Sequence, residues 1–229
     1  MGITQQIGAS SLIKPGVIDN TAARPASPFE GQVIFQKDTD QLLVWNGTAW
    51  VIPNSPAQNP MGLELVIDAS FTAQTSVPVT GCFTSTYKNY RVIIDIESAS
   101  TQTTRNITFR FKDSGGDDST ANYYYGSNLD ELGSTNSQRQ GAYAATSAII
   151  AAWYGYADST CTTSIDVYNP QLSTAKSRYI GTAIGGNASA ASVGPIACEF
   201  LTAKTHTGFT FFSSTGTITG NYYVYGYRD

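Results

Sequence analysis

Charged side chains are scarce in this chain, and none of them forms a run. They account for 13% of the 229 residues, and the formal net charge is −4. Lys and Arg occur singly along the sequence, whereas a nucleic-acid-binding protein usually carries a basic patch on one face or along one helix. The composition therefore argues against nucleic acid as a partner.

Long apolar runs are also missing. No window approaches the roughly 20 apolar residues that a membrane-spanning helix needs. The first sixteen residues, MGITQQIGASSLIKPG, lack the basic segment followed by a continuous apolar stretch that marks a secretory signal peptide. We expect a protein without membrane insertion that is made in a reducing cytoplasm.

Cysteine and histidine are few. Cys82, Cys161 and Cys198 lie far apart with no CxxC motif, which indicates neither a disulfide framework nor a zinc site. We expect three free thiols buried in a core. The single histidine, His206, follows a predicted strand without a GxSxG motif elsewhere in the chain, so we expect a surface histidine and not a catalytic base.

Acidic residues gather at only one place, in the stretch KDSGGDDST. Asp113, Asp117 and Asp118 there could supply oxygen ligands to calcium, but no glutamate follows at the EF-hand position, and a solvated turn is the plainer interpretation. Carboxylate pairs for glycoside hydrolysis could also be drawn from several acids. These are Asp95, Glu97, Asp113 and Glu199. No internal repeat of the parallel β-helix kind accompanies them, so we expect no enzymatic activity, no metal and no cofactor.

Aromatic residues, glycine, serine and threonine are abundant, a mixture that favours short strands joined by tight turns. In NYRVIIDIES, residues 89–98, apolar and polar side chains alternate, and RNITFRFKD, residues 105–113, repeats the pattern. Such alternation is typical of antiparallel strands with one wet face. We predict an all-β protein whose residues 62–229 form an antiparallel, jelly-roll-like β-sandwich, with 147–156 as a strand despite its alanines.

The region before residue 62 divides into three parts. Residues 1–28 contain three prolines and two isolated apolar pairs, Leu12-Ile13 and Val17-Ile18, so we expect an extended arm that docks into a neighbouring subunit or another protein. Residues 29–53 predict a small three-stranded meander. Residues 54–61 are rich in proline and polar side chains, which indicates a linker.

The meander contains two of the three tryptophans in the chain, Trp45 and Trp50. Asn46-Gly47 between them predicts a two-residue type I′ hairpin turn. A meander this small has too little core to be stable alone, so we expect both tryptophans to be packing residues in an assembly. A platform for sugar stacking is the alternative.

A glycine- and serine-rich stretch from Asp113 to Tyr143 predicts a long loop. Tyrosine together with Ser, Gly and Asn is the composition of adaptable binding surfaces. We therefore expect ligand contacts in this loop, unless its tyrosines lie at a subunit interface. The candidate binding residues are Tyr123, Tyr124, Tyr125, Asn128 and Arg139.

The stretch TAARPASPFEGQVIFQKDTDQLLVWNGTAWV, residues 21–51, resembles a module of bacteriophage virion proteins, chiefly tail-fibre and related surface proteins. The module reads approximately RPxxPxEGQxIYxTDTxxLxVWNGxxW, and this chain departs from it at Phe35 and Lys37. The last strand, TITGNYYVYGYRD, is similar to the end of small β-rich domains in the same kind of protein. The matching positions are Arg24, Pro25, Pro28, Glu30, Gly31, Gln32, Asp38, Thr39, Asp40, Trp45, Asn46, Gly47 and Trp50.

The resemblance implies a non-catalytic structural protein at the virion surface, and a homotrimer. We expect a tail fibre or adhesin that attaches to another virion protein through residues 1–28. Its sandwich domain would then face a glycan or protein of the host cell surface. The alternative is a capsid decoration or cement protein, such as a trimeric head-stabilising or head-fibre protein.

Overall fold

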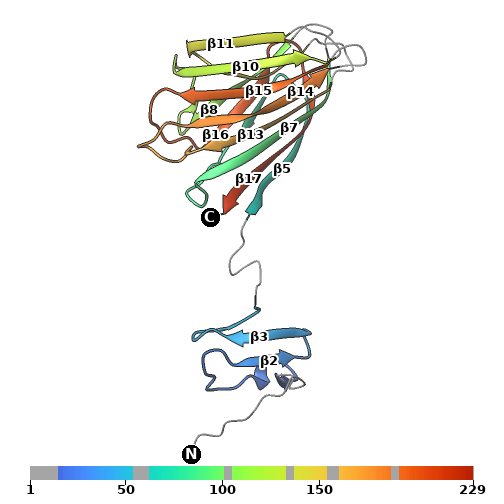
Figure 1. The fold of residues 1–229 in the computed structure, drawn as a ribbon, viewed down its shortest axis with the longest axis vertical. Coiled ribbons are helices and arrows are strands. Elements are labelled where there is room, and N and C mark those ends of the chain that lie inside the picture. Colours follow the sequence, from blue (N-terminus) through green and yellow to red (C-terminus); the bar gives the residue numbers. More distant parts are fainter. Residues whose placement is uncertain are drawn as a thin grey trace, which may run out of the picture. The chain divides into compact units, whose positions relative to one another are not determined.

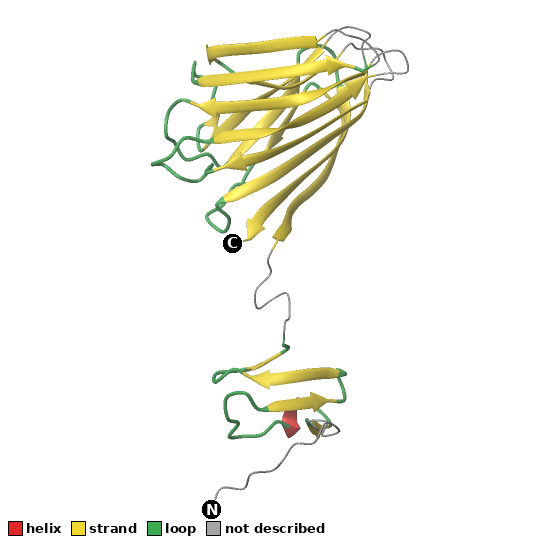
Figure 2. Cartoon of the chain, viewed as in Figure 1, coloured by secondary structure: helices red, strands yellow, loops and turns green. Residues whose placement is uncertain are grey.

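The computed structural model describes residues 15–53, 62–100, 105–132, 137–153, 160–186 and 191–228. Strands form nearly all of its regular structure (Figures 1 and 2), and the predicted all-β fold is confirmed. The one helix within those ranges is a single 3-10 turn, Thr21–Ala23, and none there has the length or apolar character to cross a membrane. The chain divides into two compact units, Met1–Met61 and Gly62–Asp229. The sandwich domain was expected to start at the same residue, 62.

The N-terminal unit contains a four-stranded sheet in the order β1-β2-β3-β4. Three strands form the expected meander, but β1 comes from the segment expected to be an extended arm, and it pairs in parallel with β2. Val17 and Ile18 therefore belong to this sheet, which corrects the prediction for that part of residues 1–28. Leu12 and Ile13 lie outside the described residues. The bounds are β1 Gly16–Ile18, β2 Val33–Gln36, β3 Gln41–Trp45 and β4 Trp50–Val51.

A buried glutamine connects the segment around the 3-10 turn to the sheet of this unit. The side chain of Gln36 has 0% exposure. Its Oε1 accepts a hydrogen bond from Arg24 Nε at 2.9 Å, and its Nε2 donates to Thr21 Oγ1 at 3.1 Å and to Asp38 Oδ1 at 2.7 Å. Because a buried amide must find such partners, this network fixes the segment around the 3-10 turn against β2.

The turn between the two tryptophans differs from the prediction. Trp45 pairs directly with Trp50, so the connection has four residues, and of Asn46 and Gly47 only Gly47 has a positive φ, 93°. The Asn46 side chain instead accepts hydrogen bonds from the backbone N–H of Thr48 and Ala49, at 2.9 and 2.8 Å. This local capping by asparagine makes a type I′ turn unnecessary, and that prediction was wrong.

The C-terminal unit has two antiparallel sheets with a common core (Figure 1). The larger sheet has eight strands in the order β11-β10-β15-β14-β13-β7-β17-β5, and the smaller has the order β12-β8-β16-β6, with β9 paired to β8. The larger sheet comprises β5 Gly62–Gln74, β7 Asn89–Ala99, β10 Tyr123–Glu131, β11 Ser137–Ala145, β13 Thr160–Tyr168, β14 Arg178–Gly186, β15 Ala191–Phe200 and β17 Ile218–Arg228. The smaller comprises β6 Ser76–Val79, β8 Arg105–Asp113, β9 Gly116–Asp117, β12 Ala148–Trp153 and β16 Gly208–Ser213.

Alternation of apolar and polar residues decides which face of each strand is buried. In β7 the side chains of Tyr90, Val92, Ile94 and Ile96 are buried, as the sequence pattern predicted, and Ala99 is buried as well. The side chains between them face away from the smaller sheet. Antiparallel strands with this period-two pattern place one row of side chains in the core and leave the other row in contact with solvent.

Aromatic rings fill the space between the two sheets. Phe109 of β8 stacks on Phe209 of β16, with ring centroids 5.2 Å apart, and meets Tyr179 of β14 edge-on at 5.4 Å. Phe111 stacks on Tyr123 of β10 in the same way, at 6.4 Å. Since Tyr123 and Tyr179 belong to the larger sheet, these contacts join the two layers of the sandwich.

The stretch from Asp113 to Tyr143 is not the long loop that the sequence predicted. It contains β9 and the hairpin β10–β11 at one edge of the larger sheet. Its glycines and serines conceal an alternation in which Tyr123, Ser127 and Leu129 are buried. The predicted strand at 147–156 is present as β12, and residues 154–156 lie outside the described part. The jelly-roll arrangement stays a prediction.

Candidate binding surface

Three neighbouring strands, β10, β15 and β14, build a hollow on the outer face of the larger sheet. Their register aligns Tyr124 with Glu199 and Glu199 with Arg178. One step further along β13, Tyr168 lies opposite Arg178. Because directly opposed residues on antiparallel strands lie on the same face, these four side chains form one row across the sheet, with a tyrosine at each end.

The adjacent row has small residues on β10 and β15. Gly126 of β10 lies opposite Ala197 of β15, and Ala197 lies opposite Ile180 of β14. A Cβ atom added at Gly126 would meet no other atom within 4 Å. Missing side-chain volume in this row, next to the tyrosines and Arg178, produces the hollow.

The hollow has two connected parts. The larger has a volume of about 560 Å³, and the smaller about 360 Å³. Both share Gly126, Ile180 and Ala197, and the smaller part extends to Asn128 and Pro195. Each volume lies in the range of roughly 300–1,000 Å³ that small-ligand sites occupy. The hollow therefore runs parallel to the strands, away from the row that contains Glu199.

A group of three charges lies at one end of the hollow. Glu199 accepts from Lys176 Nζ through Oε1 and from Arg178 Nε through Oε2, both at 2.6 Å. Hydrogen bonds from Lys176 and Arg178 lower the pKa of Glu199 below its ordinary value. The ionised carboxylate thus pairs with both cations at this end of the hollow.

A second polar network lies beside the hollow on the same face. Arg91 donates to both carboxylate oxygens of Asp166, at 2.8 and 3.0 Å, and Tyr227 Oη donates to Asp166 Oδ1 at 2.6 Å. Burial, followed by the hydrogen bond to Asp166, raises the pKa of Tyr227 to about 12. Asp166 lies opposite Ile180, so this network borders the apolar wall of the hollow.

Two of the five predicted binding residues line the hollow with outward-facing side chains. Tyr124, with 56% exposure, lines the larger part, and Asn128 lines the smaller. Tyr125 is half-buried and packs against the core between the sheets. Arg139 of β11 donates from Nε to Asn128 Oδ1 at 3.3 Å. The predicted residues thus mark its β10 side, although they were expected on a loop.

Tyr123 lies fully inside the core. Its ring has 0% exposure, its hydroxyl donates to the carbonyl oxygen of Asp118 at 2.8 Å, and it accepts from the backbone N–H of Phe111 at 2.9 Å. Because neighbouring residues of a strand point to opposite faces, Tyr123 belongs to the core when Tyr124 belongs to the surface. The predictions of Tyr123 and Tyr125 as binding residues are corrected accordingly, because both side chains lie on the core side of β10.

Sequence reasoning missed the β13 and β14 side of the hollow. Tyr168, Arg178 and Ile180 were not proposed as site residues. A signal was present: in SRYIGTAIGG the apolar Ile180 and Ile184 alternate with buried Tyr179 and Ala183, which leaves two large apolar side chains exposed on a strand. The proximity of Tyr168, Arg178 and Ile180 to Tyr124 depends on the order of the strands in the sheet, which the alternation of apolar and polar residues does not reveal.

The single histidine lies in the core, so its predicted place on the surface was wrong. His206 has 0% exposure, stacks on Phe111 with centroids 4.6 Å apart, and has its Nδ1 2.8 Å from Ser177 Oγ. Its Nε2 is buried without a hydrogen-bond partner. Burial lowers the pKa of His206 to about 4, so the ring is neutral at physiological pH.

The acidic cluster is paired with lysines. Lys204 contacts both Asp113 and Asp118, with 2.7 Å to Asp118 Oδ2, and Lys112 contacts Asp117 Oδ1 at 2.7 Å. The hydrogen bond from Lys204 lowers the pKa of Asp113. Across the described ranges, no group of three or more His, Cys, Asp or Glu is arranged to hold a metal ion.

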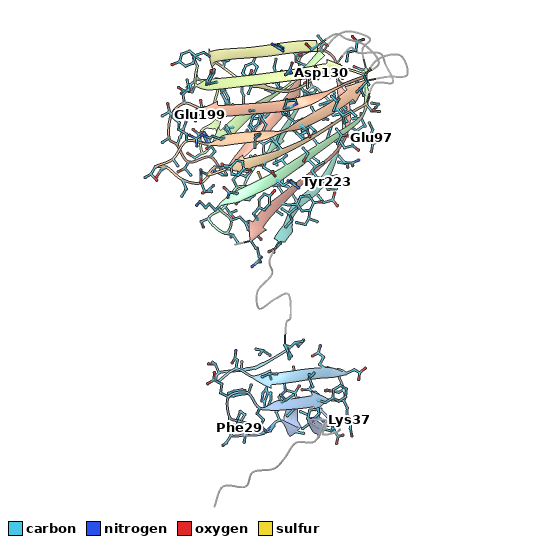
Figure 3. All side chains as sticks on the ribbon, viewed as in Figure 1. Phe29, Lys37, Glu97, Asp130, Glu199 and Tyr223 are labelled. Atoms are coloured by element: carbon cyan, nitrogen blue, oxygen red, sulfur yellow. The ribbon has the colours of Figure 1, made fainter. Side chains whose placement is uncertain are left out.

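Glu199 lies far from two of the other acids considered for glycoside hydrolysis, Asp95 and Glu97. Glu97 and Glu199 lie toward opposite ends of the larger sheet (Figure 3). Asp95 and Glu97 belong to β7, three strands from Glu199 in β15, which corresponds to about 14 Å at the usual strand spacing. That separation exceeds the roughly 5–9.5 Å between the two carboxyl groups of glycosidases.

The tryptophans of the N-terminal unit pack against each other, and the cysteines of the sandwich belong to its core. Trp45 and Trp50 are half-buried and meet edge-to-face, with centroids 5.6 Å apart. Their role in packing against another chain stays a prediction. The three cysteines are free and buried, as expected.

Comparison of the chain with protein-family models, with curated proteins and with solved structures gives no match. Function is therefore inferred from the geometry of the hollow and from the resemblance of residues 21–51.

Proposed function

We propose that this chain is a non-catalytic recognition protein of a bacteriophage virion, a tail fibre or adhesin that forms a homotrimer. In this proposal the sandwich contacts the host cell surface, and the N-terminal residues attach to another virion protein. The observation that carries recognition is the tyrosine-bordered hollow on the outer face of the larger sheet. The attribution to a virion depends on the resemblance of residues 21–51.

Two properties of the hollow support a binding role. Its side chains project from the paired strands β10, β13, β14 and β15, so the backbone that positions them is held by hydrogen bonds on both sides. Tyr124 and Tyr168 offer large amphipathic rings with few rotatable bonds, which give contact area at a low entropic cost. A site built on sheet strands is also held in place more accurately than one built on loops.

Trimer formation is tested separately from recognition. Multi-angle light scattering on the purified full chain at micromolar concentration should give three times the mass of one chain. If the measured mass remains that of a single chain even at about 100 times this concentration, the trimer is contradicted. The binding role would still be open.

Immunogold electron microscopy tests the location. Antibodies raised against the purified full chain should label the tail of intact particles produced by the phage that encodes it. Gold distributed over the capsid would instead establish the decoration or cement role. Particles without any label, next to a control antibody against a known virion protein that does label, would overturn the virion proposal.

A further inference from the structure

We propose that the hollow between Tyr124 and Tyr168 binds a neutral glycan, with its sugar rings lying along the strand direction. This inference deepens the proposed function, because it assigns the chemical class of the ligand. The supporting observations are the placement of the rings, the pairing of the charges and the position of the hollow within the sheet.

The surfaces of the hollow match the two kinds of surface on a sugar. A pyranose presents patches of C–H groups on its faces and hydroxyl groups around its edge. Tyr124 and Tyr168 are exposed at two sides of the hollow, where they can pack against C–H faces, while Ile180 and Ala197 supply an apolar floor. Aromatic side chains that combine an apolar face with a polar tip suit such an amphipathic ligand.

Hydrogen-bonding groups lie at both ends of the hollow in fixed positions. Glu199 and Arg178 hold each other at one end, and Arg139 orients Asn128 at the other. Tyr124 and Asn128 are four residues apart in β10, which corresponds to about 13 Å along the strand. This length exceeds one hexose unit, so the ligand is an oligosaccharide or a polysaccharide segment.

The charges favour neutral sugars over acidic ones. Glu199 joins Lys176 and Arg178 in a compact group, and Asp166 accepts both hydrogen bonds of Arg91 beside the hollow. An acidic sugar would have to compete with Glu199 for its two cations. Hydroxyl groups, in contrast, can donate hydrogen bonds to the carboxylates and accept them from the cations while the ion pairs of Glu199 and of Asp166 stay intact.

The position of the hollow argues against a peptide bound as an extra strand. Strand addition needs an exposed sheet edge with unpaired backbone groups. Here β10, β15 and β14 are each paired on both sides. The larger sheet instead has its edges at β11 and β5, away from the centre of the hollow.

The experiment begins with a glycan array that carries neutral and acidic oligosaccharides, probed with the labelled full chain. Isothermal titration calorimetry with the best neutral oligosaccharide then compares the natural chain with variants. Tyr124→Ala and Tyr168→Ala should each weaken binding roughly tenfold or more, as expected for loss of a central aromatic contact. Gly126→Val should do the same by partly filling the hollow, because a Cβ atom at this position meets no other atom within 4 Å.

A tyrosine on the same face supplies the matched control. Tyr223 of β17 is half-buried and does not line either part of the hollow (Figure 3). Tyr223→Ala should therefore leave affinity within about twofold of the natural chain. Each variant is accepted only if its thermal transition and its mass in solution match those of the natural chain, which excludes misfolding as a cause.

Several results would overturn the glycan site. These are no binding on the array, binding to acidic glycans alone, or an affinity that falls equally in Tyr223→Ala and Tyr124→Ala. A change of oligomeric state in Gly126→Val would show instead that the hollow is a contact between copies of this chain. Because none of these measurements uses the virion, failure of the glycan site and failure of the virion proposal are distinguishable.

Discussion

The two faces of the eight-stranded sheet use the same amino acid in opposite ways. On the inner face Tyr90, Tyr123 and Tyr179 are buried, and each hydroxyl donates to a backbone carbonyl, those of Thr84, Asp118 and Ile149 respectively. On the outer face Tyr124 has 56% exposure, and Tyr143, which meets it edge-on at 5.7 Å, has 74%.

Tyr123 and Tyr124 show the contrast most directly, because they are neighbours in β10. Tyr123 makes two hydrogen bonds to backbone groups inside the sandwich, whereas Tyr124 borders the hollow. The two tyrosines differ because neighbouring residues of a strand point to opposite faces of the sheet. Composition does not distinguish them. A run of tyrosines is therefore evidence for a binding surface only after the faces of its strand are known.

The strongest test of the core that the inner face covers is Phe109→Ala, in β8 of the smaller sheet. Phe109 is fully buried and touches Phe111, Phe209 and Tyr179. Its truncation should lower the free energy of unfolding by about 3–5 kcal/mol, through lost transfer energy and the cavity left behind. Urea denaturation followed by fluorescence measures the change, with exposed Thr182→Ala in β14 as the control. A loss below about 1 kcal/mol would mean that the two sheets do not share this core.

The neighbouring tyrosines allow a matched pair of single-atom changes. Tyr123→Phe leaves the Phe111 N–H and the Asp118 carbonyl without their partner, and an orphaned buried group costs about 1–3 kcal/mol. Tyr124→Phe should leave stability unchanged within about 0.5 kcal/mol, as for most surface substitutions. Equal effects in urea denaturation would contradict the assignment of the two faces.

The buried histidine gives stability a pH dependence. Its folded pKa of about 4 lies below the unfolded value of 6.5, so the unfolded chain binds the extra proton first as the pH falls. The contribution of the neutral histidine to the free energy of unfolding is fully present above pH 6.5 and decreases toward pH 4. The loss amounts to about 2 kcal/mol between pH 7 and pH 5. Asp113, Asp118 and Lys204, which act on the ring electrostatically, contribute little to this interval because the acids titrate below it.

His206→Gln should remove most of that pH dependence in urea denaturation at pH 7, 6 and 5. The natural chain and the variant are compared as slopes against pH, so a constant loss of stability in the variant does not affect the conclusion. An unchanged slope would show that the histidine is accessible to protons in the folded state.

The smallest effect is expected at the most exposed tyrosine. Tyr143→Ala removes a ring with 74% exposure that contacts Tyr124 and does not line the hollow. The free energy of unfolding should change by less than about 0.5 kcal/mol. A larger loss in thermal denaturation would mean that the outer face contributes to stability in the way the inner face does.

Regular alternation made much of the sandwich predictable. The buried side chains of β7 and β8 could be assigned from the sequence because long apolar residues alternate with charged ones. The hairpin β10–β11 could not, since glycine and serine occupy many of its positions and a β-bulge shifts its register between Tyr123 and Tyr125. Ala144 in this irregular segment has a positive φ of 55°, a conformation that no local residue preference announces.

The candidate site was predictable only on one side. Tyr124 and Asn128 attract attention by composition, but the hollow also needs Gly126, Ala197 and Ile180, which are unremarkable alone. Their proximity depends on β15 lying between β10 and β14, an order set by long-range pairing. β1 was missed for the same reason, because only its pairing with β2 makes it a strand.

The buried thiols have a practical consequence for fluorescent labelling. Burial raises the pKa of Cys82 and of Cys161 to about 12 and raises that of Cys198 as well, and thiol reagents attack the thiolate form. All three cysteines of the chain are therefore unreactive toward maleimide dyes while the protein is folded. One cysteine introduced at the rim of the hollow, for example Asn128→Cys, would carry a dye at a single known position. The brightness of that dye would then report when the hollow is occupied.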